Sequence, residues 1–212
     1  MYIQNRIFSI SYKFILVVFG ILGLLLNFGV FSSSLDLKGL ITFSVLSNLL
    51  CIVYFTSDLL YLIKNIHDKN KTTWKPALKG IATISITLLL GWHLTGEKIT
   101  LSTAFGVSMI LVHDIVPIMT ILDWLLFDKK GYVKKASPIV WPLGPLSYFV
   151  VMVAAQMCGI HQPYPFIDVE LLGYGKVFLG VIVIFFFFVT IGYILFAVER
   201  IFIKIDGKNK SR

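Results

Sequence analysis

The chain has 212 residues, of which 57% are hydrophobic and only 14% charged, and its formal net charge is +8 at a mean hydropathy of +0.86. This composition excludes an ordinary soluble globular domain and indicates a membrane protein. The basic residues lie between apolar stretches and do not gather on one water-facing surface. We therefore expect no nucleic-acid partner.

Six apolar runs are long enough to cross a membrane. A helix needs about 20 apolar residues to span a hydrocarbon core about 30 Å thick. The predicted spans are residues 14–31, 40–63, 77–94, 104–127, 139–160 and 174–203. Short connections join them, so we predict an all-α, polytopic fold in which residues 1–212 form a single domain of six transmembrane helices.

Basic residues occupy alternate connections between these spans. They stand at Arg6 and Lys13, at 64–75 after the second span, at 129–135 after the fourth, and in the tail 200–212. The other connections contain only Lys38 and Lys98. The positive-inside rule therefore places both termini in the cytoplasm. No small-residue cleavage site follows the first span, so we expect a retained helix and not a removed signal peptide.

The fourth span, LVHDIVPIMTILDWLLF, carries three ionisable side chains: His113, Asp114 and Asp123. His113 is expected about 15 Å deep, close to the membrane midplane. Burial favours a neutral imidazole, which has one nitrogen able to accept a proton, as a general base requires. Asp123 is expected near the cytoplasmic interface, where a carboxylate can reach water.

The second span adds a polar stripe on one helix face, formed by Ser44, Ser47, Asn48 and Cys51. His93 lies near the outer end of the third span. We expect these groups to converge with His113 in the outer half of the membrane. Each also has a structural interpretation, since serine hydroxyls often bond to their own helix and an asparagine can join two helices.

Other polar residues are expected to have ordinary roles. Asp58, beside Lys64, is predicted to be solvated at the interface. Cys51 and Cys158 lie within predicted spans, where a thiol packs as a small apolar group. No spacing of histidine, cysteine or carboxylate residues matches a metal site, so we expect neither a metal nor a cofactor.

Prolines shape the fifth span and the connection that follows it. Pro138, Pro142 and Pro145 are expected to bend the start of the fifth span. The connection HQPYPFIDVELLG contains Tyr164 and is interpreted either as an aromatic lid over a cavity or as a simple interfacial turn.

Several of these motifs together resemble a known family. They are SVLSNLL in the second span, a histidine late in the third, LVHDIVPIMTILDWLLF in the fourth, and WPLGPLSYF followed by PYPFID and GY. Their order is similar to that in a bacterial family of six-span membrane proteins, itself distantly similar to the androgen-induced-gene and androgen-dependent TFPI-regulating proteins of animals. The resemblance implies a multi-pass protein of a bacterial cytoplasmic membrane.

The animal members are intramembrane hydrolases that split fatty acid esters of hydroxy fatty acids, using a threonine on span two and a histidine on span four. The resemblance implies that His113 matches this histidine, because Asp123 follows it after an apolar stretch that contains Pro117. Ser44 stands where the family has threonine, and Thr42 is the nearest threonine, so the nucleophile could be either hydroxyl. Ser44 and His113 are our expected catalytic pair.

The implied partners are a lipid or fatty-acyl ester substrate and the surrounding membrane lipids. The residues expected to contact this substrate are Ser47, Asn48, His93, Asp114, Asp123 and Tyr164. Two other functions remain open. One is a proton-coupled transporter that uses His113, Asp114 and Asp123 as a relay, and the other is a non-catalytic membrane scaffold.

Overall fold

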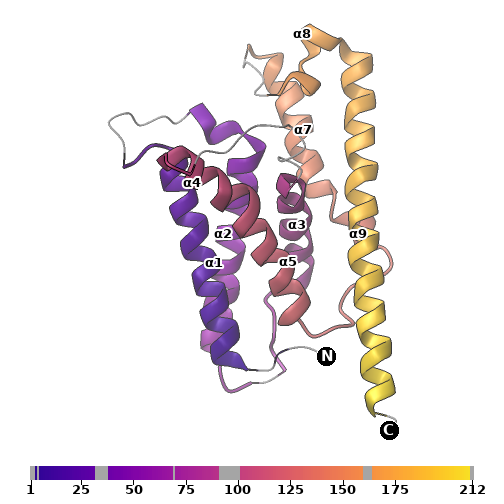
Figure 1. The fold of residues 1–212 in the computed structure, drawn as a ribbon. Coiled ribbons are helices and arrows are strands. Elements are labelled where there is room, and N and C mark those ends of the chain that lie inside the picture. Colours follow the sequence, from indigo (N-terminus) through magenta and orange to yellow (C-terminus); the bar gives the residue numbers. More distant parts are fainter. Residues whose placement is uncertain are drawn as a thin grey trace.

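The structure, a computed structural model, describes residues 3, 5–31, 38–68, 70–90, 101–159 and 164–210, which contain helices and no strand (Figure 1). The helices are α1 (Arg6–Asn27), α2 (Phe43–Lys64), α3 (Pro76–Thr87), α4 (Ala104–Ile110), the π-helical turn η3 (Leu111–Ile115), α5 (Val116–Leu126), α6 (Ser137–Val140), α7 (Leu143–Gln156), α8 (Val169–Leu172) and α9 (Tyr174–Lys210). Two 3-10 turns, η1 (Lys38–Ile41) and η4 (Pro165–Ile167), precede α2 and α8.

Five helical segments of the described chain are long and apolar enough to cross a membrane: Arg6–Asn27, Phe43–Lys64, Ala104–Leu126, Ser137–Gln156 and Tyr174–Ile205. The prediction of a helical integral membrane protein is thereby confirmed. The helical segment expected to form the third span, Pro76–Leu90, is apolar but shorter. The rest of that predicted span lies in 91–100, outside the described residues.

Both termini lie at one end of the bundle, which we call the terminal end, and α2, α4 and α8 begin at the opposite, far end (Figure 1). Helix α1 packs closely on its neighbours through two glycines. A Cβ added to Gly20 would stand 2.8 Å from Ile52 of α2, and one added to Gly23 would stand 2.9 Å from Val112 of η3. These close approaches hold α1, α2 and η3 together.

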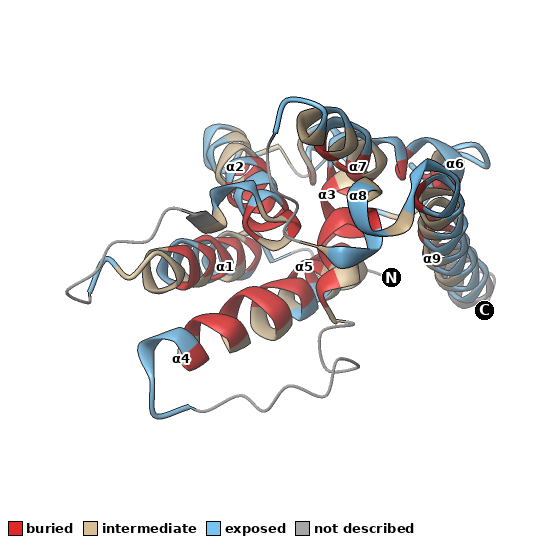
Figure 2. Cartoon of the chain, turned by 90° about the horizontal axis from the view of Figure 1, so that it is seen from above, coloured by how far each residue is buried: buried red, intermediate tan, exposed pale blue. Residues whose placement is uncertain are grey.

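Helix α9 lies at the edge of the bundle and is exposed along most of its length (Figure 2). Its FFFF run points in several directions: Phe186 is 61% exposed, whereas Phe188 is fully buried. An apolar helix with this exposure is suited to contact with lipid. The expectation that both cysteines pack as small apolar groups within spans is wrong in part. Cys51 is buried, but Cys158 is exposed and follows the end of α7.

A proline explains the widened turn η3 in the middle of the fourth span. Pro117 has no N–H to donate to the carbonyl of His113, and its ring crowds that carbonyl. The helix therefore widens into a π-helical turn here, and the Val116 N–H donates to the Leu111 carbonyl, five residues earlier. The result is that His113 and Asp114 lie on an irregular turn inside a membrane helix.

The predicted bend at the start of the fifth span is confirmed as a break between α6 and α7. Trp141 and Pro142 separate the two helices, and the Trp141 indole is almost fully buried. It packs directly over Gly80 of α3, where an added Cβ would stand 2.0 Å from the indole ring. A glycine at this point of α3 is therefore required for the contact between α3 and the α6–α7 break.

We predict that Gly80→Ala destabilises the protein by about 1–3 kcal/mol, because the new methyl group overpacks against Trp141. The preference of helices for alanine over glycine offsets about 1 kcal/mol of the overpacking at most. Gly175→Ala in α9 is the matched control, since its Cβ would meet no atom within 4 Å. Melting curves in detergent should place Gly80→Ala below the wild type and Gly175→Ala level with it or above; equal melting temperatures for the two variants would contradict the packing.

Candidate functional site

The side chain of Asn48 joins α2 to the π-helical turn. Its amide nitrogen donates to the carbonyl of Ser44 at 2.9 Å and to the carbonyl of Val112 at 3.0 Å. The Asn48 side chain therefore holds the backbone of Ser44, the candidate nucleophile, beside Val112, the residue before His113. Both amide hydrogens of Asn48 are used in these two bonds. Asn48 could therefore stabilise the oxyanion of an acyl-transfer reaction only if one of the two bonds broke.

The imidazole of His113 is 95% buried and points toward the far end of its helix. Its Nδ1 lies 3.1 Å from the carbonyl of Met109, one turn earlier. A hydrogen bond to a carbonyl assigns the proton to Nδ1, which makes Nε2 the basic nitrogen. Helix α2 and the α4–α5 helix run in the same direction (Figure 1), and the bond from Asn48 to the Val112 carbonyl holds the turn that carries His113 beside α2.

Ser44 lies in the first turn of α2 and is half-buried. Its Oγ is 3.3 Å from the Oγ1 of Thr42, the residue before the helix. Thr42 Oγ1 donates to the carbonyl of Gly39 at 2.7 Å, so the proton of that hydroxyl is already engaged. This arrangement favours Ser44 over Thr42 as a nucleophile.

Tyr164 covers this end of α2. Its hydroxyl oxygen accepts a hydrogen bond from the N–H of Phe43 at 3.0 Å, and the backbone and hydroxyl of Ser44 face the same oxygen. Burial raises the pKa of the Tyr164 hydroxyl, so this group stays protonated and neutral. Through Tyr164, the connection between the fifth and sixth predicted spans contacts the candidate site directly.

The structure places the remaining expected residues differently. Asp114 is half-buried on the π-helical turn beside His113, whereas His93 lies outside the described residues. Ser47 is buried and lines a cavity of about 590 Å³ between α2, α3 and α7, which Phe43, Ser85 and Tyr148 also line. Asp123 lies on α5, nearer the terminal end than His113, and is bound by two lysines, as described below.

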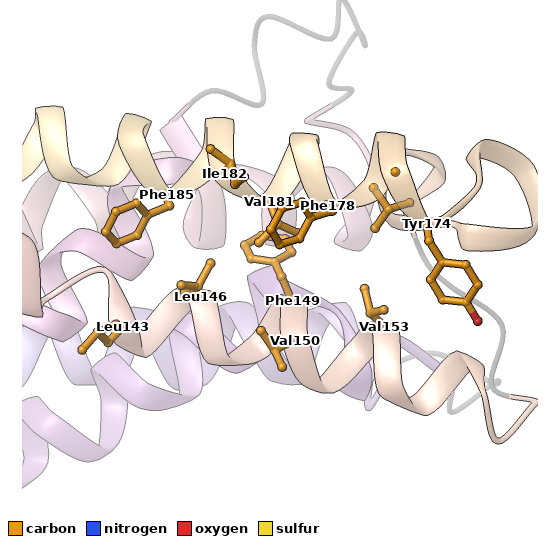
Figure 3. A pocket seen from close by; sticks show the side chains of 12 residues that line it. Leu143, Leu146, Phe149, Val150, Val153, Tyr174, Phe178, Val181, Ile182 and Phe185 are labelled. Carbon is orange, nitrogen blue, oxygen red and sulfur yellow. The ribbon is translucent and has the colours of Figure 1, made fainter.

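A second, larger cavity of about 860 Å³ lies between α7 and α9 (Figure 3). Its walls are apolar and include Leu146, Phe149, Phe178 and Phe185. Phe149 forms the inner wall and stacks on Phe43 at 5.4 Å between ring centroids. One layer of aromatic rings therefore separates this cavity from the start of α2, where Ser44 lies.

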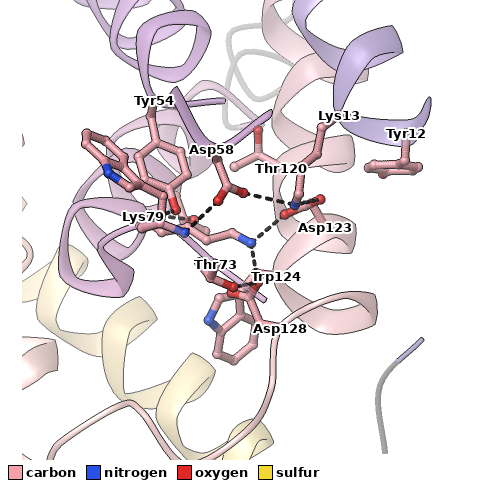
Figure 4. A network of polar contacts seen from close by, with 12 residues as sticks. Tyr12, Lys13, Tyr54, Asp58, Thr73, Lys79, Thr120, Asp123, Trp124 and Asp128 are labelled. Carbon is pink, nitrogen blue, oxygen red and sulfur yellow. Dashed lines mark hydrogen bonds and ion pairs between the residues drawn. The ribbon is translucent and has the colours of Figure 1, made fainter. Parts of the chain in front are cut away.

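Near the terminal end, five ionisable side chains from separate elements meet in the protein interior (Figure 4). We call them the ion cluster: Lys13 of α1, Asp58 of α2, Lys79 of α3, Asp123 of α5 and Asp128, which follows α5. The expectation that Asp58 is solvated at the interface is wrong, since its side chain is fully buried. Lys13 and Lys79 are equally inaccessible.

The carboxylate of Asp123 is at the centre of the ion cluster. Its Oδ1 accepts from Lys13 at 2.5 Å, and its Oδ2 accepts from Lys79. Lys79 also donates to Asp128 at 2.6 Å. These bonds tie α1, α3 and α5 together, and an unpaired charge at such a depth would cost several kcal/mol.

The connection between α2 and α3 closes the ion cluster on its terminal side. The backbone of Trp74 donates its N–H to Asp58 at 2.6 Å and accepts a bond from the hydroxyl of Tyr54 at 2.7 Å. Thr73 donates to Asp128 at 2.7 Å. The ring of Phe55 lies 5.6 Å from the Lys13 nitrogen and 5.8 Å from that of Lys79. Aromatic and backbone groups thus shield the ion cluster from water.

Sequence reasoning missed the ion cluster because it treated each charge alone. Lys13 had been assigned to a basic terminus, and Lys79 had been given no role. The expected depth of each charge along its helix is the signal that could have identified the cluster. Lys13 is about seven residues from the start of α1 and Asp58 about six residues from the end of α2. At about 1.5 Å per residue, both lie about 10 Å from the terminal end. Opposite charges at one depth are expected to pair.

Comparisons with known proteins add no identification: no described protein family, no curated protein and no solved structure matches this chain.

Proposed function

We propose that the protein is an intramembrane hydrolase of acyl esters, with Ser44 as nucleophile and His113 as general base. The observation that carries this proposal is the Asn48 amide, which binds the carbonyls of Ser44 and Val112 at once. It holds the backbone of the half-buried Ser44 beside the turn that carries the buried His113, which supports this pairing. A nucleophile and a base held in this way are the elements of acyl transfer.

The proposed reaction has two steps. Nε2 of His113 takes the proton of Ser44 as Oγ attacks the acyl carbonyl, and the same proton is returned to the departing alcohol, which leaves an acyl-serine. Water, deprotonated by His113, then attacks the acyl-serine; the Ser44 Oγ–acyl bond breaks, His113 returns the proton to Ser44 Oγ, and the fatty acid is released. The N–H groups of Phe43 and Ser44 at the positive end of α2 would stabilise the oxyanion once Tyr164 withdraws from them.

The two apolar cavities support an acyl substrate. Ligand cavities commonly have volumes of about 300–1,000 Å³, and those beside Phe43 measure about 590 and 860 Å³. The larger one lies between two helices apolar enough to span a membrane, so an acyl chain could enter it sideways from the lipid. We propose fatty acid esters of hydroxy fatty acids as the substrate class, by analogy with the family that the sequence resembles.

The proposed setting is a bacterial cytoplasmic membrane, crossed six times, with both termini in the cytoplasm. The termini share one end of the bundle (Figure 1), as an even number of crossings requires. The apolar helical segment Pro76–Leu90 would belong to the third crossing. We also propose membership of the bacterial six-span family that the motifs resemble.

A fluorophosphonate probe, which reacts with activated serine and threonine hydroxyls, tests the proposal in detergent-solubilised protein. We expect labelling of the wild type, retained labelling in Thr42→Ala and none in Ser44→Ala. Labelling of His113→Ala should be strongly reduced, because the hydroxyl loses its base. If Ser44→Ala and Thr42→Ala both label like the wild type, the assigned nucleophile is wrong.

The ion cluster favours a second candidate, a proton-coupled carrier, because buried ionisable groups in membrane spans often mark proton paths. Asp123 was expected in such a relay, and it does bind two lysines inside the bundle. Proteoliposomes loaded with a pH-sensitive dye separate the two functions. A carrier would show protein-dependent proton flux driven by a substrate gradient, whereas the hydrolase is expected to show none.

A further inference from the structure

The charges of the ion cluster do not cancel. Two lysines, Lys13 and Lys79, face three aspartates, Asp58, Asp123 and Asp128, which leaves one excess negative charge if all five are ionised. Four of these side chains are at most 1% exposed, and that of Asp128 is 10% exposed. An uncompensated charge in such surroundings is strongly unfavourable and is normally removed by a proton or a counter-ion.

The neighbouring charged groups leave this imbalance unchanged. Lys130, which follows α5, and Glu199 of α9 add one positive and one negative charge near Asp128. Glu199 accepts the Gly131 N–H at 2.6 Å, and Lys130 donates to the Trp124 carbonyl. The other polar side chains drawn around the cluster are the uncharged Tyr12, Tyr54, Thr73 and Thr120 (Figure 4), of which Tyr12 and Thr120 donate to the carbonyls of Met119 and Val116.

We propose that the ion cluster is a proton-binding site and that Asp58 holds the proton. Asp123 has both oxygens bound by lysine ammonium groups, and Asp128 accepts from Lys79 and Thr73. Asp58 accepts only the Trp74 N–H at Oδ1. Its Oδ2 is buried and has no hydrogen bond, although the Lys13 nitrogen is 3.2 Å away. A protonated carboxyl at this position removes the excess charge.

A metal cation fits this position poorly. Sodium, magnesium or calcium ions require several oxygen ligands around one point. Oδ2 of Asp58 instead faces the positive ammonium of Lys13, which would repel a second cation. Among the residues described here, no three histidine, cysteine or carboxylate side chains are grouped as metal ligands. A proton, by contrast, needs only one oxygen atom and leaves a neutral carboxyl beside the ammonium group, so it is the ligand that the geometry accommodates.

The proton has a short route to water at the terminal end. Asp128 is the most exposed carboxylate of the cluster and is linked through Lys79 and Asp123 to Lys13, which contacts Asp58. Exchange with solvent would therefore occur at the terminal side of the bundle, away from Ser44 and His113. The proton site is independent of the proposed hydrolase activity and remains if that activity is absent.

Infrared difference spectroscopy of the purified full-length protein, titrated with pH in lipid nanodiscs, tests the proposal. A buried protonated carboxyl gives a carbonyl stretch that a carboxylate lacks. We expect the wild type to show this band at neutral pH, to shift it in D2O and to lose it only at alkaline pH. Asp58→Asn should lose the band, whereas Glu199→Gln, which changes the other buried carboxylate nearby, should keep it.

A third variant tests the charge count directly. Lys13→Met leaves the cluster with a second excess negative charge, so the carboxyl band should become stronger at neutral pH. No titrating band in the wild type would overturn the proposal even if Asp58→Asn failed to fold. Persistence of the band in Asp58→Asn, its loss in Glu199→Gln, or an unchanged band in Lys13→Met would also overturn it.

Discussion

Asp123→Asn is expected to destabilise the protein by about 3–5 kcal/mol, because it leaves Lys13 and Lys79 buried without the carboxylate that both bind. Proteins of this kind have a total stability of only about 5–15 kcal/mol, so this is a large part of it. Lys13 keeps its contact with Asp58 and Lys79 its bond to Asp128, so the cost comes from the central acceptor that each buried ammonium group loses. The melting temperature in detergent, monitored by the loss of the monodisperse peak in size-exclusion chromatography after heating, should be much lower than that of the wild type.

The surface pair between Lys71 and Asp68 provides the control. Its side chains are 48% and 44% exposed, so Asp68→Asn should change stability by less than about 1 kcal/mol. A second comparison separates unpaired charge from lost packing. Replacing all five residues of the ion cluster together, the lysines by methionine and the aspartates by leucine, should recover much of the stability lost in Asp123→Asn, because no buried charge is then left without its partner. Wild-type melting of Asp123→Asn would show that the ion cluster does not stabilise the bundle.

His113→Ala is expected to lower the rate of acyl-ester hydrolysis by about 10²- to 10⁴-fold, the range typical for removal of a general base. The loss should appear in kcat, since the imidazole acts on the proton in the transition state and contributes little to substrate binding. Loss of the hydrogen bond to the Met109 carbonyl costs about 1 kcal/mol, and a melting curve of the variant checks that it remains folded.

His67 is the matched control for this variant. It is exposed beyond the end of α2 at the terminal end, so His67→Ala should hydrolyse esters at the wild-type rate. Added imidazole should restore part of the activity of His113→Ala and should not affect His67→Ala. Equal activity of the His113 and His67 variants, measured with a panel of long-chain esters in mixed micelles, would remove His113 from the mechanism.

The helical architecture could be predicted from the sequence because long apolar runs have few other ways to satisfy their backbone in lipid. The boundaries were harder. The first span was expected to begin near Phe14, after the charge of Lys13, whereas α1 begins at Arg6 and takes Lys13 into the interior. An inward-facing lysine is stable there only because Asp58 and Asp123 of other helices receive it.

The candidate site shows the same limit. The polar stripe of α2 follows from helical spacing and is present in the structure, where Ser47, Asn48 and Cys51 are buried. The depth of His113 in the membrane stays a prediction. The Asn48 bond to Val112 depends on how two helices are aligned, and the widened turn at His113 depends on how Pro117 is accommodated. The spacing of residues within one helix predicts neither the Asn48 bond nor the widened turn. The same holds for Tyr164, whose contact with the start of α2 is made across a large sequence separation.

Peptide mapping of the fluorophosphonate adduct by mass spectrometry is the most direct test of the active site. Digestion of labelled wild-type protein should place the phosphonyl group on Ser44, and pre-incubation with a long-chain ester should slow its formation. An adduct on Thr42 or on any other residue, or no adduct under conditions where the protein remains folded, would contradict an acyl-transfer site formed by Ser44 and His113.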